Sequence, residues 1–121
     1  MRLEGEQTLL RIHLSNFTKW HTQPLYEALV ERARRGHLSG ATVLKGLWGY
    51  FGTGPVLGQH PNALQVEQPV IVEIVDSTEK LNRFLEEVEE MLVGKPVLVT
   101  TERARVIHYR AGGRGKGEVG S

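Results

Sequence analysis

The chain begins with a strand pattern that gives way to a helical one. Leu10, Ile12 and Leu14 alternate with polar residues, which is the two-residue period of a half-buried strand. Residues 15–23 are mostly polar and predict a loop. Beyond them, apolar residues recur with the spacing of one helix face. This predicts a helix that begins at Pro24, ends at Gly36 and buries Tyr26, Leu29, Val30 and Ala33.

The middle of the chain predicts two strands separated by a long loop. Residues 41–50 are apolar and β-prone, and they predict the second strand. Residues 51–68 contain several glycines and prolines but no hydrophobic period, so they predict a loop. A loop of this length in a small domain is usually functional. Residues 70–75 are apolar at nearly every position, which is typical of a central strand covered on both faces.

The last third of the chain predicts a second helix and a final strand. Asp76 or Ser77 can cap this helix, and Gly94 can close it. Residues 97–109 predict the last strand, with a break near 102–105. The stripe of apolar residues along the helix has helical spacing and consists of Leu81, Phe84, Leu85, Val88 and Leu92.

The order β-α-β-β-α-β predicts an α+β, ferredoxin-like plait, in which two helices cover one face of a four-stranded antiparallel sheet. We expect residues 1–110 to form this domain and residues 111–121 to form a Gly-rich, basic tail. The other face of the sheet needs a cover, because residues such as Leu9, Val43 and Val72 would otherwise be exposed. Self-association is the simplest cover.

Composition removes several classes of function. The chain has 121 residues, which is the size of one domain, with 15 Lys and Arg against 14 Asp and Glu. This near balance argues against broad binding of nucleic acid, which needs a strongly basic face. The chain has no cysteine, which excludes disulfides and thiolate catalysis. It shows no signal peptide and no apolar run long enough to enter a membrane, so we expect a cytoplasmic protein.

Two glycine-rich stretches with basic neighbours, residues 40–52 and 106–116, carry the candidate chemistry. Glycine lets backbone N–H groups approach an anion closely, and arginine adds charge and a forked donor geometry. This combination indicates phosphate recognition rather than catalysis. The candidate binding residues, with the lysine that follows the second helix, are Gly46, Gly49, Tyr50, Phe51, Gly52, Lys95, His108, Arg110, Gly112, Arg114 and Lys116.

Three blocks of sequence in this order, residues 24–30, 40–46 and 69–76, resemble the P-II-like signalling superfamily, and most closely its branch known as domain of unknown function 190. The resemblance covers residues 8–110. It implies a homotrimer that binds an adenine nucleotide (ATP, ADP, AMP or a cyclic nucleotide, with or without magnesium) in clefts between subunits. It also implies a long loop that docks on a partner protein such as a membrane transporter or an enzyme. The residues themselves show no Ser/His/Asp arrangement, Walker loop or activated nucleophile, so we expect no enzymatic activity.

The P-II proteins themselves are a more distant resemblance. Residues 49–52 match the glycines at the base of their long loop, and His108, Arg110 and Gly112 match a basic motif that ends their last strand. The resemblance implies that both groups hold phosphate. This chain departs from the motif at His108, where an arginine is expected, and histidine is a weaker phosphate partner that depends on pH.

Other interpretations remain open from the residues alone. Arg110 can be a solvated strand end, Lys95 can complete a helix dipole, and Trp48 can be a core or interface aromatic. The protein can be a docking module that needs no nucleotide. A divalent-metal-binding trimer of the cation-tolerance type is a further alternative, although none of the five histidines has the H-x-x-x-H spacing of a metal site.

Overall fold

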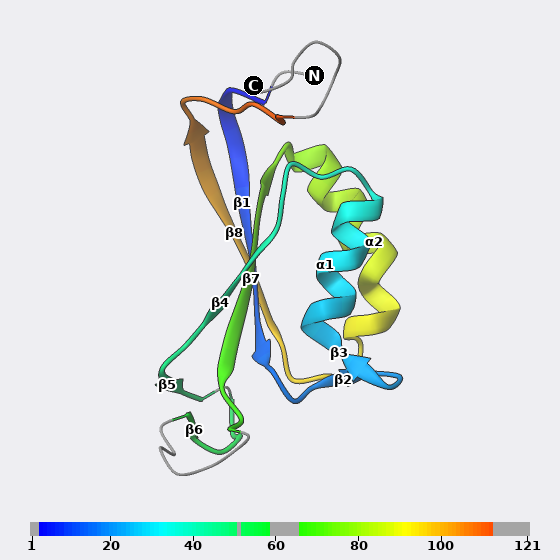
Figure 1. Cartoon of the computed structure of the whole chain (residues 1–121), viewed down its shortest axis with the longest axis vertical. Helices are drawn as coiled ribbons and strands as arrows, with labels where there is room; N and C mark the ends of the chain where they lie inside the picture. The colour runs from blue at the N-terminus through cyan, green and yellow to red at the C-terminus, as the bar shows by residue number, and fades with distance from the viewer. Residues whose placement is uncertain (1–2, 51, 59–65, 113–121) are drawn as a thin grey trace.

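The protein is a four-stranded sheet with both helices on one face (Figure 1). A computed structural model describes residues 3–50, 52–58 and 66–112. It confirms the predicted α+β plait, whose main elements are β1 (Gly5–Ser15), α1 (Leu25–Arg35), β4 (Thr42–Lys45), β7 (Pro69–Asp76), α2 (Thr78–Leu92) and β8 (Leu98–Val106).

The sheet has the order β4-β7-β1-β8, and every neighbouring pair is antiparallel. The register of the strands shows which residues lie at each of the two ends of the sheet. Leu14 lies opposite Val70 at one end, and Gly5 lies opposite Val106 at the other. The β4–β7 connection leaves the first end, whereas β8 finishes at the second (Figure 1). The loop and the basic strand end are therefore at opposite ends of the sheet.

The core lies between the sheet and the helices. Alternate residues of the two central strands, among them Leu10, Ile12 and Val72, are completely buried. They pack with a stripe from each helix that includes Leu29 and Val88. The period-2 and helical patterns in the sequence predict this core directly.

Part of the expectation for the open face is wrong. Val72 points into the core, and Val43, its partner across the β4–β7 ladder, packs against the same cluster. Only Leu9 of the three residues lies on the face away from the helices. Val72 was misassigned because a nearly continuous apolar strand carries no alternation to show which residues face inward.

Two termini of helices show how local sequence is used. The Ser77 side chain caps α2 by accepting the Lys80 backbone N–H at 3.2 Å, as predicted. Gly36 is the C-cap of α1, but its φ of −82° is not the left-handed conformation for which glycine is usually selected at the end of a helix. The left-handed residue is His37, with φ 61°. The chain thus turns out of α1 at a histidine whose side chain is exposed.

Two predicted strands and one predicted loop are corrected. The second strand ends at Lys45 rather than at residue 50, and residues 48–49 form a separate short strand, β5 (Trp48–Gly49). The last strand, β8, is shorter than 97–109. It has no break, because the backbone ladder to β1 continues through residues 102–105, three of which are charged. The predicted loop at residues 15–23 contains a small antiparallel pair, β2 (Lys19–Trp20) with β3 (Gln23–Pro24).

The face of the sheet away from the helices combines apolar and charged residues. Arg11 is at its centre and joins Glu73 at 2.9 Å and Glu102 at 3.4 Å. Around this ion pair lie apolar side chains on all four strands, among them Leu9, Leu44, Ile71, Val75 and Leu98. Leu44 and Leu98 are 42% and 51% exposed. Within the part of the chain that the structure describes, no helix is long and apolar enough to cross a membrane.

Candidate functional site

The predicted site residues fall into two groups at opposite ends of the sheet. Gly46 and Gly49 follow β4, and His108 and Arg110 follow β8. The nine steps along β1 that separate Gly5 from Leu14 correspond to about 30 Å at about 3.3 Å per residue. A single protomer therefore cannot bring both groups to one phosphate.

Gly46 is needed by the packing of the loop base. Its backbone N–H donates to the Pro69 carbonyl at 2.6 Å. A Cβ at this position would lie 2.8 Å from Cγ of Pro69 and 3.1 Å from its carbonyl oxygen. The Gly46 N–H is thus already used by the protein, and the glycine is explained by close contact with Pro69. At Gly49 a Cβ would meet Pro69 Cγ at 3.8 Å, an ordinary contact.

Sequence reasoning missed the most constrained glycine of the loop base, Gly58. It belongs to β6 (Leu57–Gly58), which pairs with β5. Its φ is 98°, and a Cβ here would lie 2.2 Å from the Leu47 carbonyl oxygen. The requirement for glycine at this position was not predicted, because Gly58 lies in a stretch without hydrophobic period. In such a stretch a single glycine cannot be told from the glycines that are common in loops.

The loop has two stems: residues 46–49, which follow β4, and residues 66–68, which precede β7. The second stem is fixed to the end of β1. Asn16 forms two hydrogen bonds with the Gln68 backbone, one from its own N–H at 3.0 Å and one to its Oδ1 at 2.8 Å. Ser15 Oγ donates to Glu67 Oε2 at 2.6 Å. The Glu67 carbonyl accepts the Gly58 N–H at 2.8 Å. The two stems and β1 are therefore one connected unit.

Beyond this unit the loop base exposes large apolar side chains. Leu47, Trp48, Tyr50 and Val56 are each more than half exposed, and Trp48 is 64% exposed. The interpretation of Trp48 as a core residue is wrong for the protomer. Phe51, a predicted site residue, lies outside the described residues.

Lys95 lies at the loop-base end, but it is engaged by the β2–β3 pair. Its Nζ donates to the Lys19 carbonyl at 3.0 Å and lies 5.4 Å from the centre of the Trp20 ring. A cation above an indole ring is favourable. Lys95 therefore fastens the end of α2 to the β2–β3 pair in this structure.

At the other end of the sheet, one buried carboxylate organises the backbone. Asp76 is fully buried and accepts the backbone N–H groups of Ser39 and Ser77, each at 2.8 Å. Lys80 Nζ lies 3.9 Å from the same side chain. The Ser39 hydroxyl donates to the Val75 carbonyl. Asp76 thereby holds the α1–β4 connection against the start of α2.

A hollow of about 660 Å³ opens beside this connection. We call it the strand-end hollow: its walls are Val30, Ala33 and Arg34 of α1, residues 37–41, and Ala111. Its volume is in the range of small-molecule sites, and an apolar floor with a few polar groups is typical of them. Arg34 supplies a positive charge to its lining, and His37 supplies an imidazole.

The segment after β8 closes one side of the strand-end hollow. The Tyr109 hydroxyl donates to the Ser39 carbonyl at 3.1 Å. Arg110 is exposed and immediately precedes Ala111, which lines the hollow. His108 Nδ1 lies 3.8 Å from Glu4 Oε2. Gly112 is exposed. The predicted basic residues Arg114 and Lys116 lie outside the described residues.

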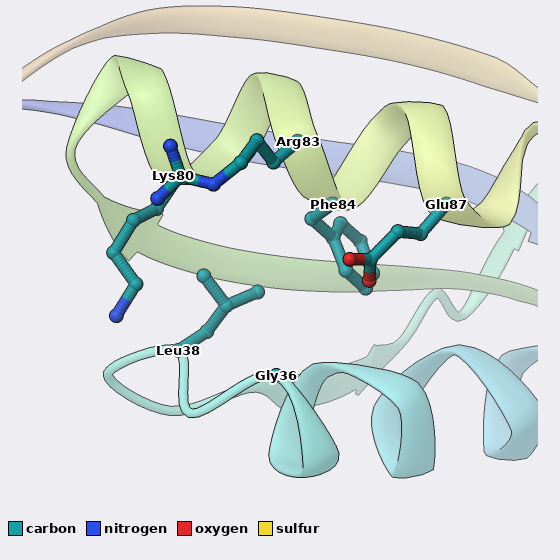
Figure 2. A pocket seen from close by; sticks show the side chains of 6 residues that line it. All are labelled: Gly36, Leu38, Lys80, Arg83, Phe84 and Glu87. Atoms are coloured by element: carbon teal, nitrogen blue, oxygen red, sulfur yellow. The ribbon is translucent and has the colours of Figure 1, made fainter.

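A second, smaller hollow lies on the other side of Leu38, between the end of α1 and α2 (Figure 2). Lys80 and Arg83 of α2 lie at its edge, and Phe84 closes it toward the core. Its volume is about 60 Å³. That is room for a few water molecules, not for a nucleotide.

Electrostatics on the open face favour a charged Arg11 and a neutral His13. The hydrogen bond to Glu73 raises the pKa of Arg11, and Glu102 adds to this effect. Burial lowers the pKa of His13, and the nearby Arg11 charge lowers it further, while Glu73 acts in the opposite direction. Ile71 and Leu98 lie opposite His13 on the two neighbouring strands.

Comparison with known families shows the family to which the chain belongs. Residues 7–106 match the model of the family DUF190, described as "Uncharacterized ACR, COG1993". The chain belongs to the DUF190 family. A UPF0166 protein from Aquifex aeolicus is 38% identical over 103 residues, which are 85% of this chain and 95% of that protein. The resemblance inferred from the sequence is confirmed.

Solved structures place this family member in the PII-like fold. CPII from Thiomonas intermedia K12, a nitrogen regulatory PII-like protein bound to ADP, AMP and bicarbonate, superposes with a TM-score of 0.66 at 16% identity, covering 85% of this chain and 90% of CPII. A putative PII-like signaling protein from Thermus thermophilus gives 0.61 at 22% identity, covering 88% and 94%. CutA from Synechococcus elongatus PCC7942 gives 0.53 at 12% identity, covering 88% and 81%. At these identities the likeness concerns the fold.

The site contains residues that sequence reasoning did not select. Arg34 and His37 were interpreted through helix-end chemistry or metal spacing. Arg34 lines the hollow from α1, and His37 lines it from the left-handed turn that follows the helix. Glu4 belonged to a polar lead-in without pattern. Among the described residues, no three His, Asp or Glu side chains gather closely enough to hold a metal ion.

Proposed function

We propose that the protein is a PII-like signalling protein, without enzymatic activity, whose homotrimer binds an adenine nucleotide between copies of the chain. The observation that carries the proposal is the separation of the two candidate groups. The loop base offers backbone at Gly49, and the strand end offers Arg110 beside a hollow, about 30 Å apart along a sheet rising about 3.3 Å per residue. In this proposal a second copy of the chain completes the site.

The open face of the sheet supports assembly. Leu9, Leu44 and Leu98 lie there around the Arg11 ion pairs, and an apolar face of this kind is stabilised when another chain covers it. A closed ring, in which each copy presents its loop base to the strand end of the next, would bury this face and form one nucleotide site at each junction.

The chemistry of the strand-end hollow supports a nucleotide as the ligand. An apolar floor at Val30 and Ala33 suits a base, and Arg34 and Arg110 suit phosphate oxygens. Structures of CPII, which has the same fold, contain ADP and AMP. Lys95, Tyr50 and Gly52 at the loop base are the remaining described candidates for contacts from the neighbouring copy.

In this proposal the nucleotide shifts the loop between two arrangements, and the loop engages a partner protein such as a membrane transporter. The connected stems at Ser15, Glu67 and Gly58 would transmit a change at the loop base to β1. The exposed Trp48 and Tyr50 are the side-chain types that dominate protein interfaces. The same exposure favours the second candidate, a docking module that needs no nucleotide.

Thermal unfolding with ATP, ADP, AMP, cyclic AMP and cyclic di-AMP, each with and without magnesium, separates these candidates. A ligand at one hundred times its dissociation constant adds about 2.7 kcal/mol to the free energy of unfolding. A shift with selected nucleotides supports the signalling protein. No shift with any of them would leave the docking module, and a shift with divalent cations alone would favour the metal-binding alternative.

A further inference from the structure

Glu4 occupies the position that an anion would take beside the strand end. Its Oε2 accepts the Tyr109 backbone N–H at 3.4 Å and lies 3.8 Å from His108 Nδ1. One carboxylate oxygen thus faces one backbone donor and one imidazole. These are the two kinds of group that a phosphate oxygen would use here.

The backbone at Glu4 is held in place by its neighbours. Leu3 is only 4% exposed, so it anchors the segment before β1. Gly5 pairs with Val106 at the first rung of the β1–β8 ladder. The Glu4 side chain is 32% exposed, so it is open to solvent on one side. An anion that competes with this carboxylate would displace the side chain and leave the anchored backbone in place.

We infer that Glu4 is a specificity-determining residue of the proposed nucleotide site: its carboxylate competes with the ligand for His108 and the Tyr109 N–H, so that only a strongly charged phosphate group displaces it. This inference rests on the proposed function. Such competition would keep the histidine at position 108 from binding every small anion. A monoanion gains little by replacing a carboxylate that is already present, whereas a diphosphate brings more charge and further contacts, including Arg110.

The test compares ADP with adenosine in calorimetric titrations of three proteins: the wild type, Glu4→Gln and Glu6→Gln. Glu4→Gln keeps the shape of the side chain and removes its charge. Glu6→Gln removes the same charge from β1 at an exposed position that faces Arg105 across the ladder. Thermal unfolding without ligand establishes that all three are folded, and Glu4→Asp, with its shorter reach, serves as a second variant.

We expect Glu4→Gln to bind ADP about fivefold more tightly than the wild type. This is the size of the repulsion between two unit charges, here the Glu4 carboxylate and the ADP phosphate, about 4 Å apart under water-like screening. Glu4→Asp should show a smaller gain, and Glu6→Gln should bind as the wild type does. Adenosine affinity should not change, because it has no phosphate to compete with Glu4.

Each outcome bears on one claim or the other. ADP binding that is equal or weaker in Glu4→Gln than in the wild type would overturn the role of Glu4 and leave the nucleotide site intact. An equal gain for adenosine would also overturn it, because the effect would not involve phosphate. ADP binding by none of the proteins would overturn the proposed function and this inference with it.

Discussion

The two ends of the sheet differ in what holds their backbone in place. At the loop base, stems cross at close range, and glycines are required because a Cβ would strike Pro69 or Leu47. At the strand end, a buried carboxylate and a tyrosine hydroxyl hold the turn, and Arg34 lies in the lining of a hollow that Arg110 adjoins in the chain. The glycines at the loop base are thus needed mainly for packing, whereas the strand end carries the arginines that could bind an anion.

The largest expected effect is at the strand end. Asp76→Ala removes the acceptor of two partly buried backbone N–H groups, from Ser39 and Ser77. We expect the free energy of unfolding to fall by about 3 kcal/mol or more, since each hydrogen bond to a charged group contributes about 1.5–3 kcal/mol. Denaturant unfolding measures this. Glu79→Ala, at an exposed position in the first turn of α2, is the control. A loss no larger than that of Glu79→Ala would show that Asp76 does not organise this end.

The next effect concerns binding rather than stability. Arg110→Ala should weaken ADP binding by about 1.5–3 kcal/mol, the scale of hydrogen bonds to charged groups, and leave thermal unfolding unchanged because the side chain is exposed. Titration calorimetry gives the affinity. Arg105→Ala, an exposed arginine within β8, is the matched control. If Arg110→Ala kept wild-type affinity, Arg110 would have no place in the site.

At the loop base we expect a loss of stability from one added methyl group. Gly58→Ala places a Cβ against the Leu47 carbonyl at a φ of 98°, and backbone strain of this kind costs about 1–3 kcal/mol. Gly40→Ala, where a Cβ would have open space, is the control. Both are measured by denaturant unfolding. Equal stability of the two variants would mean that the loop base adapts and is not tightly built.

The smallest effect is a pH dependence on the open face. The pKa of His13 is lowered by burial and by Arg11, so the unfolded chain, with a pKa near 6.5, takes up this proton more readily. Stability from this group is therefore present at higher pH and lost as the pH falls through about 6.5 toward the folded value. His13→Gln should be less sensitive to acid than the wild type over that window. The same slope in both proteins would exclude His13 as the cause.

The parts of the fold that the sequence predicts are those with a period. Leu10, Ile12 and Leu14 indicated β1, and the stripe from Leu81 to Leu92 indicated α2, because burial on one face imposes those spacings. Val72 was placed on the wrong face because its strand has apolar residues on both sides. The β5–β6 pair was missed because hydrogen bonds between two-residue strands leave no hydrophobic pattern.

The candidate site was predicted by residue type but not by location. Arg110 and Gly49 were selected from composition and resemblance, without use of the predicted topology. In that topology the second and last strands run in opposite directions and therefore finish at opposite ends of the sheet. His37 joins the strand-end hollow at a left-handed turn formed by a residue that is not glycine. Glycine is the usual sequence signal of such a turn, so His37 left no local sign of it. Two residues later, Asp76 accepts the Ser39 N–H and holds the connection.

Complementation between copies tests the shared site most directly. Gly49→Asp, whose Cβ fits beside Pro69, would place a negative charge at the loop base, and Arg110→Ala would remove the cation at the strand end. Each variant alone should bind ADP weakly. After unfolding together and reassembly, about one site in four should regain wild-type affinity if copies mix at random in a closed ring. Mixed assemblies, identified by native mass spectrometry, that regain no ADP binding would contradict a site formed between two copies.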